Sequence, residues 1–301
     1  MKNTVKVIHG IIFHILSLVI SISSFGCKET TSDTNLDQCL DSEYVWAKSI
    51  GGKQIDSIVS ISLSPDAQFS YVAGNFEDSV NCDGKSIVST SASRDGFFAK
   101  LDVSGNVVFI KNVGGPGSDA ITGIAAGDSN YAYITGHFIY EATFGFVTKR
   151  SSSTTGLNFF MSRIEPDGGT IIVHALGGTP TNPTAEAYGE RIAWDSIEKK
   201  VYVEGMFKGA LTATLKDGTK ATIVNRTQWK PFTAVFDPSG NWLDLQPTLT
   251  QGKPYTTLNT KDKDGYYYET GTFTGTMTKG PGNKTIVSAG KTDGFIIKYC
   301  Q

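Results

Sequence analysis

The feature that most constrains the fold of this chain is an internal repeat of about 63 residues. A short motif that ends in two adjacent glycines recurs along the sequence, and its first glycine stands at Gly51, Gly114 and Gly177. A fourth, degenerate copy of the motif begins at Trp242. A fixed period of this length is typical of folds in which one supersecondary unit is stacked several times.

Two further motifs show that the unit occurs four times. The second motif keeps a tyrosine, a glycine and a phenylalanine at fixed spacing, and its glycines are Gly74, Gly136, Gly205 and Gly271. We expect equivalent buried positions for its phenylalanines, which are Phe76, Phe138, Phe207 and Phe273. The third motif is an apolar run that ends in Asp or Glu. Because the motifs are rich in aromatic and β-branched residues, each predicts a strand, and the shared glycine indicates a bulge or a close backbone approach.

Turn signals separate these motifs and set the number of strands. Asp-x-Ser-Gly-Asn and related segments occur at residues 102–106, 165–169 and 237–241. Glycine supplies a positive φ in such turns, and Asp or Pro favours their first positions. Each unit therefore provides at least four antiparallel strands, which is the content of a propeller blade. The sequence predicts an all-β chain, with any substantial helix confined to the segment before Cys27.

The order of the motifs resembles the bacterial β-propeller repeat family often called SBBP. The resemblance rests on residues 95–102, which read Asp-Gly-Phe-Phe-Ala-Lys-Leu-Asp, and on the Ser-Gly-Asn and Gly-Gly segments that follow. It extends from about Tyr44 to Tyr299. It implies a small β-propeller of four repeat blades and says nothing about activity, because propellers host unrelated functions.

The two ends of the repeat region predict how the ring closes. The first strand, at residues 44–50, has no partner before it, and the last strand, at residues 294–299, has no successor. In the interior copies one tight turn joins the corresponding strands. The N-terminal strand is therefore expected to pair with the C-terminal strand and close the propeller, which removes exposed sheet edges. The alternatives are a two-sheet sandwich or a half-ring that dimerises.

The cysteines agree with this closure. Cys39 and Cys300 both fall at the mouth of the turn that the two terminal strands would replace, so we expect a disulfide between them. Such a bond persists in exported proteins. Cys82, in a small hairpin of the first repeat, is expected to be a half-buried thiol.

The first residues read as an export signal. Lys2 and Lys6 precede an apolar stretch at about residues 7–25, which is too short and too polar for a comfortable membrane span. The segment resembles the signal of spirochaete lipoproteins, which implies cleavage after residue 26 and lipidation of Cys27. Ordinary cleavage that leaves Cys27 as a plain thiol is the alternative. The domains are then a signal peptide at 1–26, a polar tether at 27–38 and the repeat domain at 39–301. The expected location is the cell envelope, in the outer membrane or at the cell surface.

Charge and motif content exclude several functions. Lys and Arg total 27 against 29 for Asp and Glu, so the chain lacks the basic excess of a nucleic-acid-binding protein. Nucleophile elbows, phosphate loops and zinc-spaced cysteines are absent from the sequence. His137 and His174 are the only histidines after the signal, and neither has a motif partner. The sequence predicts no catalytic residue, no cofactor and no metal site.

The third repeat departs most from the pattern and supplies the candidate binding residues. An extra loop at residues 179–189 lengthens the connection between its first two motifs. Loops on a rigid scaffold often carry function, and the best polar candidates here are Glu186, Glu190 and Arg191. The alternative is that Glu190 and Arg191 form a solvated ion pair at a strand end and have no binding role. We expect a non-enzymatic binding module for a protein or carbohydrate ligand. The alternatives are a carbohydrate-active enzyme, which would need two converging carboxylates, and a structural envelope protein.

Overall fold

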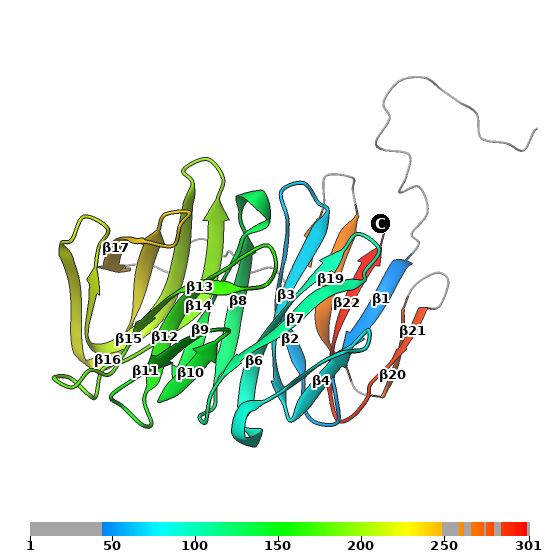
Figure 1. The fold of residues 1–301 in the computed structure, drawn as a ribbon, viewed down its shortest axis with the longest axis horizontal. Coiled ribbons are helices and arrows are strands. Elements are labelled where there is room, and N and C mark those ends of the chain that lie inside the picture. Colours follow the sequence, from blue (N-terminus) through cyan, green and yellow to red (C-terminus); the bar gives the residue numbers. More distant parts are fainter. Residues whose placement is uncertain (1–43, 249–258, 262–265, 274, 280–283, 300–301) are drawn as a thin grey trace, which may run out of the picture. The chain divides into compact units, whose positions relative to one another are not determined.

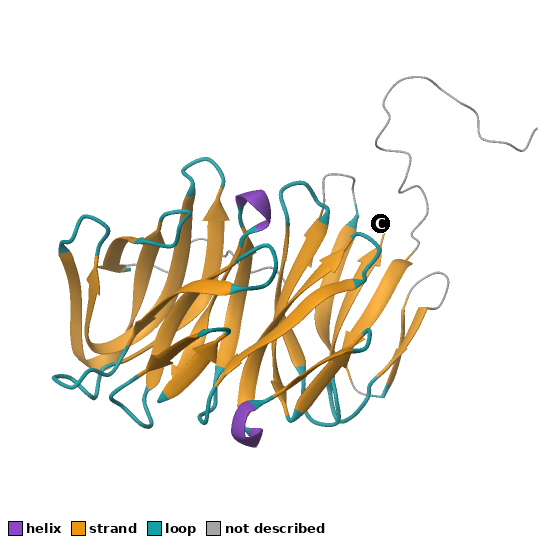
Figure 2. Cartoon of the chain, viewed as in Figure 1, coloured by secondary structure: helices purple, strands orange, loops and turns teal. Residues whose placement is uncertain are grey.

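The computed structural model describes residues 44–248, 259–261, 266–273, 275–279 and 284–299. Strands make up most of this part of the chain (Figure 2), so the all-β prediction is confirmed. The helical elements described are two short 3₁₀ turns, η2 (Thr90–Ala92) and η3 (Asp128–Asn130). No helix within the described ranges has the length and apolar character needed to cross a membrane.

Four antiparallel sheets follow the four repeats, and most of their strands are labelled in Figure 1. The first sheet contains β2 (Ser57–Leu63), β3 (Phe69–Glu77), β6 (Arg94–Asp102) and β7 (Val107–Gly114). The second contains β8 (Ala120–Ala126), β9 (Ala132–Ile139), β12 (Leu157–Ile164) and β13 (Thr170–Leu176). The third contains β14 (Glu186–Asp195), β15 (Lys200–Thr214), β16 (Lys220–Phe236) and β17 (Trp242–Pro247). The fourth contains β1 (Tyr44–Ile50), β18 (Asn259–Lys261), β19 (Tyr267–Phe273) and β22 (Asp293–Tyr299).

Each of three repeats also contains a short two-stranded hairpin. These hairpins are β4 (Ser79–Cys82) with β5 (Lys85–Val88), β10 (Glu141–Phe144) with β11 (Val147–Arg150), and β20 (Thr276–Lys279) with β21 (Lys284–Val287). The β10–β11 hairpin belongs to the second repeat but pairs with β7, which makes the first sheet six-stranded. Four repeat-based sheets exclude the two-sheet sandwich considered from the sequence.

The predicted pairing of the two terminal strands is confirmed. β1 runs antiparallel to β22, with Tyr44 opposite Tyr299 and Ile50 opposite Gly294. Cys27, Cys39 and Cys300 lie outside the described residues, so the lipidation and the disulfide stay predictions. Cys82 is a free, fully buried thiol, and burial raises its pKa to about 12.

In the first three repeats the shared glycine lies opposite a β-bulge, as expected from the sequence. A Cβ atom at Gly74, Gly136 or Gly205 would lie 2.0, 2.0 or 2.2 Å from a carbonyl oxygen of the neighbouring strand. That neighbouring strand shifts register next to the glycine in each of these three repeats. The bulge brings the two backbones together, and only a residue without Cβ fits there.

Neighbouring sheets pack face to face through one recurring set of contacts. The fourth sheet packs on the first, the first on the second and the second on the third. The tyrosine of the repeat motif donates its hydroxyl to a turn carbonyl of the next sheet. Tyr71 Oη lies 2.7 Å from the Asn130 oxygen, and Tyr133 Oη lies 2.7 Å from the Pro238 oxygen. On the opposite face of the motif strands Phe76, Phe138 and Phe207 are at most 1 % exposed, as expected for equivalent core positions.

The third sheet differs from the first two because, among the described residues, only one of its faces packs against another sheet. Along β15 buried and half-buried residues alternate, whereas the central residues of β3 are buried on both faces. Among the described strands, none of the third sheet packs extensively against the fourth. The closed ring predicted from the sequence would need that contact.

Candidate binding surface on the third sheet

The three candidate residues lie in a strand and not in a connecting loop. Glu186, Glu190 and Arg191 all belong to β14, which begins within the stretch expected to be the extra loop. The strand extends further because Ala187 and Gly189 pair with Phe207 and Gly205 of β15. A bulge between Gly189 and Arg191 leaves Glu190 out of register with β15.

Cross-strand ion pairs hold two of the candidates. The Glu186 carboxylate lies 2.8 Å from Lys208 Nζ, and Arg191 Nη1 lies 3.4 Å from the Glu204 carboxylate. Both pairs are half-buried, so each fixes side-chain positions while its contribution to stability stays small. Glu190 and Arg191 are neighbours in sequence, but Arg191 pairs across the sheet.

These charges share the face of the third sheet against which no other described sheet packs. Val203 and Phe207 of β15 point toward the second sheet and are buried with its side chains. Glu204 and Lys208 alternate with them and therefore lie on the opposite face. The position of Glu204 is occupied by Ala73 in the first repeat and by Thr135 in the second, both with 0 % exposure. This face therefore carries charge where the earlier repeats bury a small side chain.

An aromatic pair adjoins the ion pairs. The Tyr188 and Trp229 ring centroids lie 5.2 Å apart with the rings tilted by 60°, and Lys208 Nζ lies 5.6 Å from the Trp229 centroid. Burial, followed by the charge of Glu190, raises the pKa of Tyr188. Both rings are half-buried and so remain partly accessible. We call these six residues the third-sheet face: Glu186, Tyr188, Arg191, Glu204, Lys208 and Trp229.

Sequence reasoning missed Trp229. It lies in β16 between Asn225, which pairs with Gly209, and Lys230, which pairs with Phe207. Four residues of β16 therefore have no counterpart in β15 at this point, and Trp229 is the last of them. A repeat alignment would show these residues as an insertion into the third repeat, and a tryptophan in such an insertion was the available signal.

A small hollow of about 90 Å³ lies on the same side of the sheet. Gly205, Met206 and Phe232 contribute apolar lining, and Glu190, Arg191 and Glu204 contribute charged lining. Pockets that bind whole small molecules measure about 300–1,000 Å³. The hollow is the size of a single inserted side chain, and it is too small for a sugar ring between two catalytic carboxylates.

Other neighbouring carboxylates lie inside the protein. Asp95 and Asp119 are 0 % exposed between the first and second sheets, where they accept backbone N–H bonds from Thr90 and Ile139. Burial, opposed by the Ile139 bond and assisted by the charge of Asp95, raises the pKa of Asp119 to about 7. These carboxylates accept backbone hydrogen bonds at a sheet junction and are not accessible to solvent.

The histidines are also built into sheet junctions. His174 Nε2 lies 2.6 Å from the Gly240 carbonyl oxygen of the third sheet. Burial, with a smaller effect of the Arg94 charge, lowers the pKa of His137 to about 4. No group of three or more His, Cys, Asp or Glu side chains suited to a metal occurs within the described part of the chain.

A scan against protein-family models found no match for this chain, and neither did a search of curated proteins. The class of the protein is therefore defined by its architecture, an all-β chain of four repeated antiparallel sheets.

Proposed function

We propose that this chain is a non-enzymatic binding module and that the third-sheet face binds a protein partner. The observation that carries the proposal is the change of character of this face between repeats. In the first and second repeats the same face packs against the next sheet. In the third repeat it carries two ion pairs and a partly accessible Tyr–Trp pair.

The residue types favour a protein as the occupant. Trp, Tyr and Arg are the residues that contribute most often to protein–protein binding energy. The face holds charges of both signs, which suits a partner surface with complementary charges and provides specificity. In addition, the equivalent faces already contact protein, since Tyr71 and Tyr133 donate to turns of the next sheet. Tyr202, their counterpart, bonds to Glu198 of its own sheet at 2.9 Å.

The four sheets are, in this proposal, propeller-type blades of the SBBP-like repeat. The recurring junctions and the β1–β22 pairing support this reading. A closed four-blade ring and an open row of blades differ in one contact, that of the third sheet with the fourth. The charges on the third-sheet face favour the open form, because covering them would desolvate Glu204 and Lys208.

A photoreactive amino acid in place of Met206, at the centre of the third-sheet face, tests both points. The full chain is cross-linked in its native cells and the joined peptides are identified by mass spectrometry. We expect an adduct with one defined protein, and Lys208→Glu should reduce its yield several-fold by reversing a face charge. A photoreactive residue at Ile171, which is 65 % exposed on β13, is the control and should not give the same adduct.

Two outcomes of this experiment contradict the proposal. A cross-link from position 206 to the fourth sheet of the same chain would show that the ring closes and that the face is internal. A cross-link only to a second copy would make the face an oligomer interface.

The location proposed for the module is the cell envelope, with a lipid on Cys27 as the membrane anchor. The apolar N-terminal stretch and the small residue before Cys27 support it. Growth with a labelled fatty acid should mark the chain, and Cys27→Ala should abolish the label. Labelling that persists in this variant would mean that the cleavage site was misread.

Two other functions have less support. A carbohydrate-active enzyme needs two carboxylates facing an open cavity. The close acid pair Asp95 and Asp119 is sealed, and the hollow with Glu190 and Glu204 has room for one side chain. A purely structural envelope protein would have no reason to keep the Tyr188–Trp229 pair accessible.

A further inference from the structure

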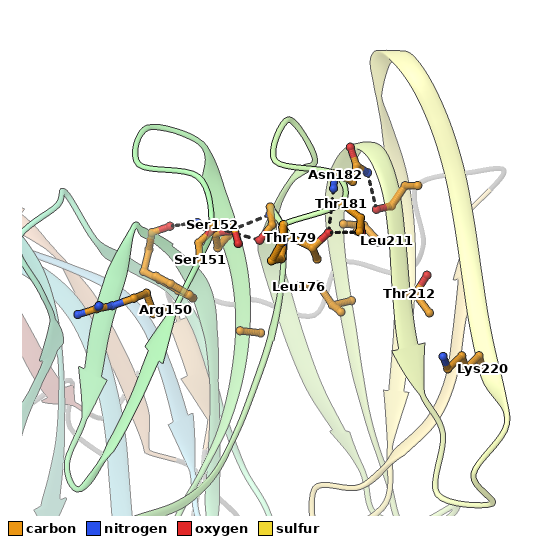
Figure 3. A pocket seen from close by; sticks show the side chains of 17 residues that line it. Arg150, Ser151, Ser152, Leu176, Thr179, Thr181, Asn182, Leu211, Thr212 and Lys220 are labelled. Carbon is orange, nitrogen blue, oxygen red and sulfur yellow. Dashed lines mark hydrogen bonds between the residues drawn. The ribbon is translucent and has the colours of Figure 1, made fainter.

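A cleft of about 600 Å³ lies where the extra loop of the third repeat meets the long β15–β16 hairpin (Figure 3). One wall includes residues 179–182, from the extra loop. Another includes Leu211, Thr212 and Lys220, from the outer part of the β15–β16 hairpin. In the other repeats this hairpin is a separate pair of four-residue strands. Two independent departures from a regular scaffold therefore form the same cavity.

Hydrogen bonds hold the loop in place against the hairpin. Asn182 Nδ2 donates to the Ala210 carbonyl oxygen at 3.2 Å. Within the loop the backbones of Thr179 and Asn182 exchange two N–H···O bonds of 3.1 and 3.0 Å. On the opposite side Ser152 N donates to the Gly178 oxygen at 3.2 Å. The cleft is thus preformed, which reduces the entropy cost of binding a ligand.

Neutral hydrogen-bonding groups dominate the lining. Hydroxyls come from Thr179 and Thr181 of the extra loop, and Figure 3 shows those of Ser151 and Ser152 on one side of the loop and that of Thr212 on the other. The Ser152 hydroxyl has no hydrogen-bond partner among the described residues. The Thr179 and Thr181 hydroxyls contact one another at 3.3 Å, which leaves lone pairs available. Leu176 and Pro180 add apolar surface between these groups.

The cleft has few charged lining residues. None of the described residues that line it is Asp or Glu. Lys220 and Arg150 are its charged lining residues. Arg150 is engaged in an ion pair with Glu141 of its own hairpin and extends away from the other labelled side chains in Figure 3. Among the described lining residues, a multiply charged anion would therefore find only Lys220 as an unpaired cation.

We infer that this cleft binds a neutral saccharide. A sugar ring presents many hydroxyls, each a donor and an acceptor, together with C–H surfaces that pack on apolar side chains. Serine, threonine and asparagine side chains match the hydroxyls, and Leu176 and Pro180 match the C–H surfaces. The cavity volume lies within the range of sites that enclose small ligands, so it accommodates a short oligosaccharide.

Binding is tested with the full chain in a detergent that contains no sugar. The probes are short neutral oligosaccharides of glucose, galactose, mannose and N-acetylglucosamine, followed by saturation-transfer NMR and calorimetry. The variant Thr212→Trp places a large ring at the wall of the cleft and should raise Kd at least about tenfold. Thr278→Trp is the matched control. Thr278 faces Thr285 in another hairpin with hydroxyls 3.0 Å apart, as Thr212 faces Thr222 at 3.0 Å.

Saturable binding that is lost in Thr212→Trp and kept in Thr278→Trp supports the saccharide site. Absence of binding by the unaltered chain overturns it, and so does equal binding by both variants. Preference for sulfated or carboxylated sugars over neutral ones would also overturn it, because Lys220 would then dominate recognition. The third-sheet face is not altered in these variants, so the result does not depend on the proposed protein partner.

Discussion

Gly136→Ala is expected to destabilise the protein by about 3 kcal/mol or more, because the new Cβ has no space. At this position a Cβ would lie 2.0 Å from the Ala120 carbonyl oxygen, which belongs to the backbone of β8. Backbone atoms within a paired strand cannot move aside without breaking the bulge and its ladder. Urea unfolding followed by circular dichroism gives the free energy of unfolding of both forms.

Gly84→Ala serves as the control for this experiment. Gly84 has a φ of +75°, but nothing lies within 4 Å of the Cβ that it would gain. Its substitution should cost only the left-handed backbone penalty of about 1–2 kcal/mol. If Gly136→Ala proved no more destabilising than Gly84→Ala, the inference that the backbones of β8 and β9 approach closely at Gly136 would be contradicted.

Phe138→Ala should cost about 3–5 kcal/mol of unfolding free energy. Phe138 is 1 % exposed, and its ring packs edge-on against Phe144 with centroids 6.4 Å apart. Removal of the ring leaves a cavity between the second sheet and the hairpin docked on the first. Chemical denaturation at constant pH measures the loss.

The matched control for this substitution is Phe146→Ala in the neighbouring hairpin. Phe146 is 100 % exposed, so its truncation should change stability by no more than about 0.5 kcal/mol. A loss below about 1 kcal/mol at Phe138 would mean that the repeat alignment is wrong at this residue.

Features that repeat along the chain were predictable from sequence. The Tyr–Gly–Phe motif predicted a buried strand in each repeat. A pattern shared by four copies at fixed spacing identifies a strand more reliably than any single segment does. The shared glycine identified the bulge, since a residue without Cβ is required there. The pairing of β1 with β22 followed from the offset between the repeat boundaries and the ends of the domain.

Features confined to one repeat were harder to predict. Glu186 was expected in a loop because Pro and Thr, which loops favour, are frequent just before it. It lies in β14, where an alternating burial pattern begins at Ala185. The long β15–β16 hairpin and the Tyr188–Trp229 pair depend on an insertion that has no second copy for comparison. One signal was readable in advance, since Glu204 replaces the buried residues Ala73 and Thr135 in a motif otherwise retained.

The closed ring expected from the sequence stays a prediction, because repeat spacing does not determine whether the third sheet meets the fourth. The spacing and order of the repeat motifs indicate which strands pair within a blade, because those strands share hydrogen bonds and a register. Whether the third sheet meets the fourth depends on small rotations at three earlier junctions. Each rotation is set by side-chain packing, as at Trp46, whose Nε1 donates to the Val103 oxygen at 3.0 Å.

The pairing of the first strand with the last has a consequence for the timing of folding. Ser49 Oγ in β1 bonds to the Asp293 carboxylate in β22 at 3.0 Å, across 244 residues of chain. Synthesis of the chain from its N-terminus produces β1 first and its partner β22 last. Contacts of such long sequence separation form slowly, because the intervening loop must be closed first. The fourth sheet therefore cannot be completed during synthesis until the C-terminal residues have been made, and β1 stays without its β22 partner until then.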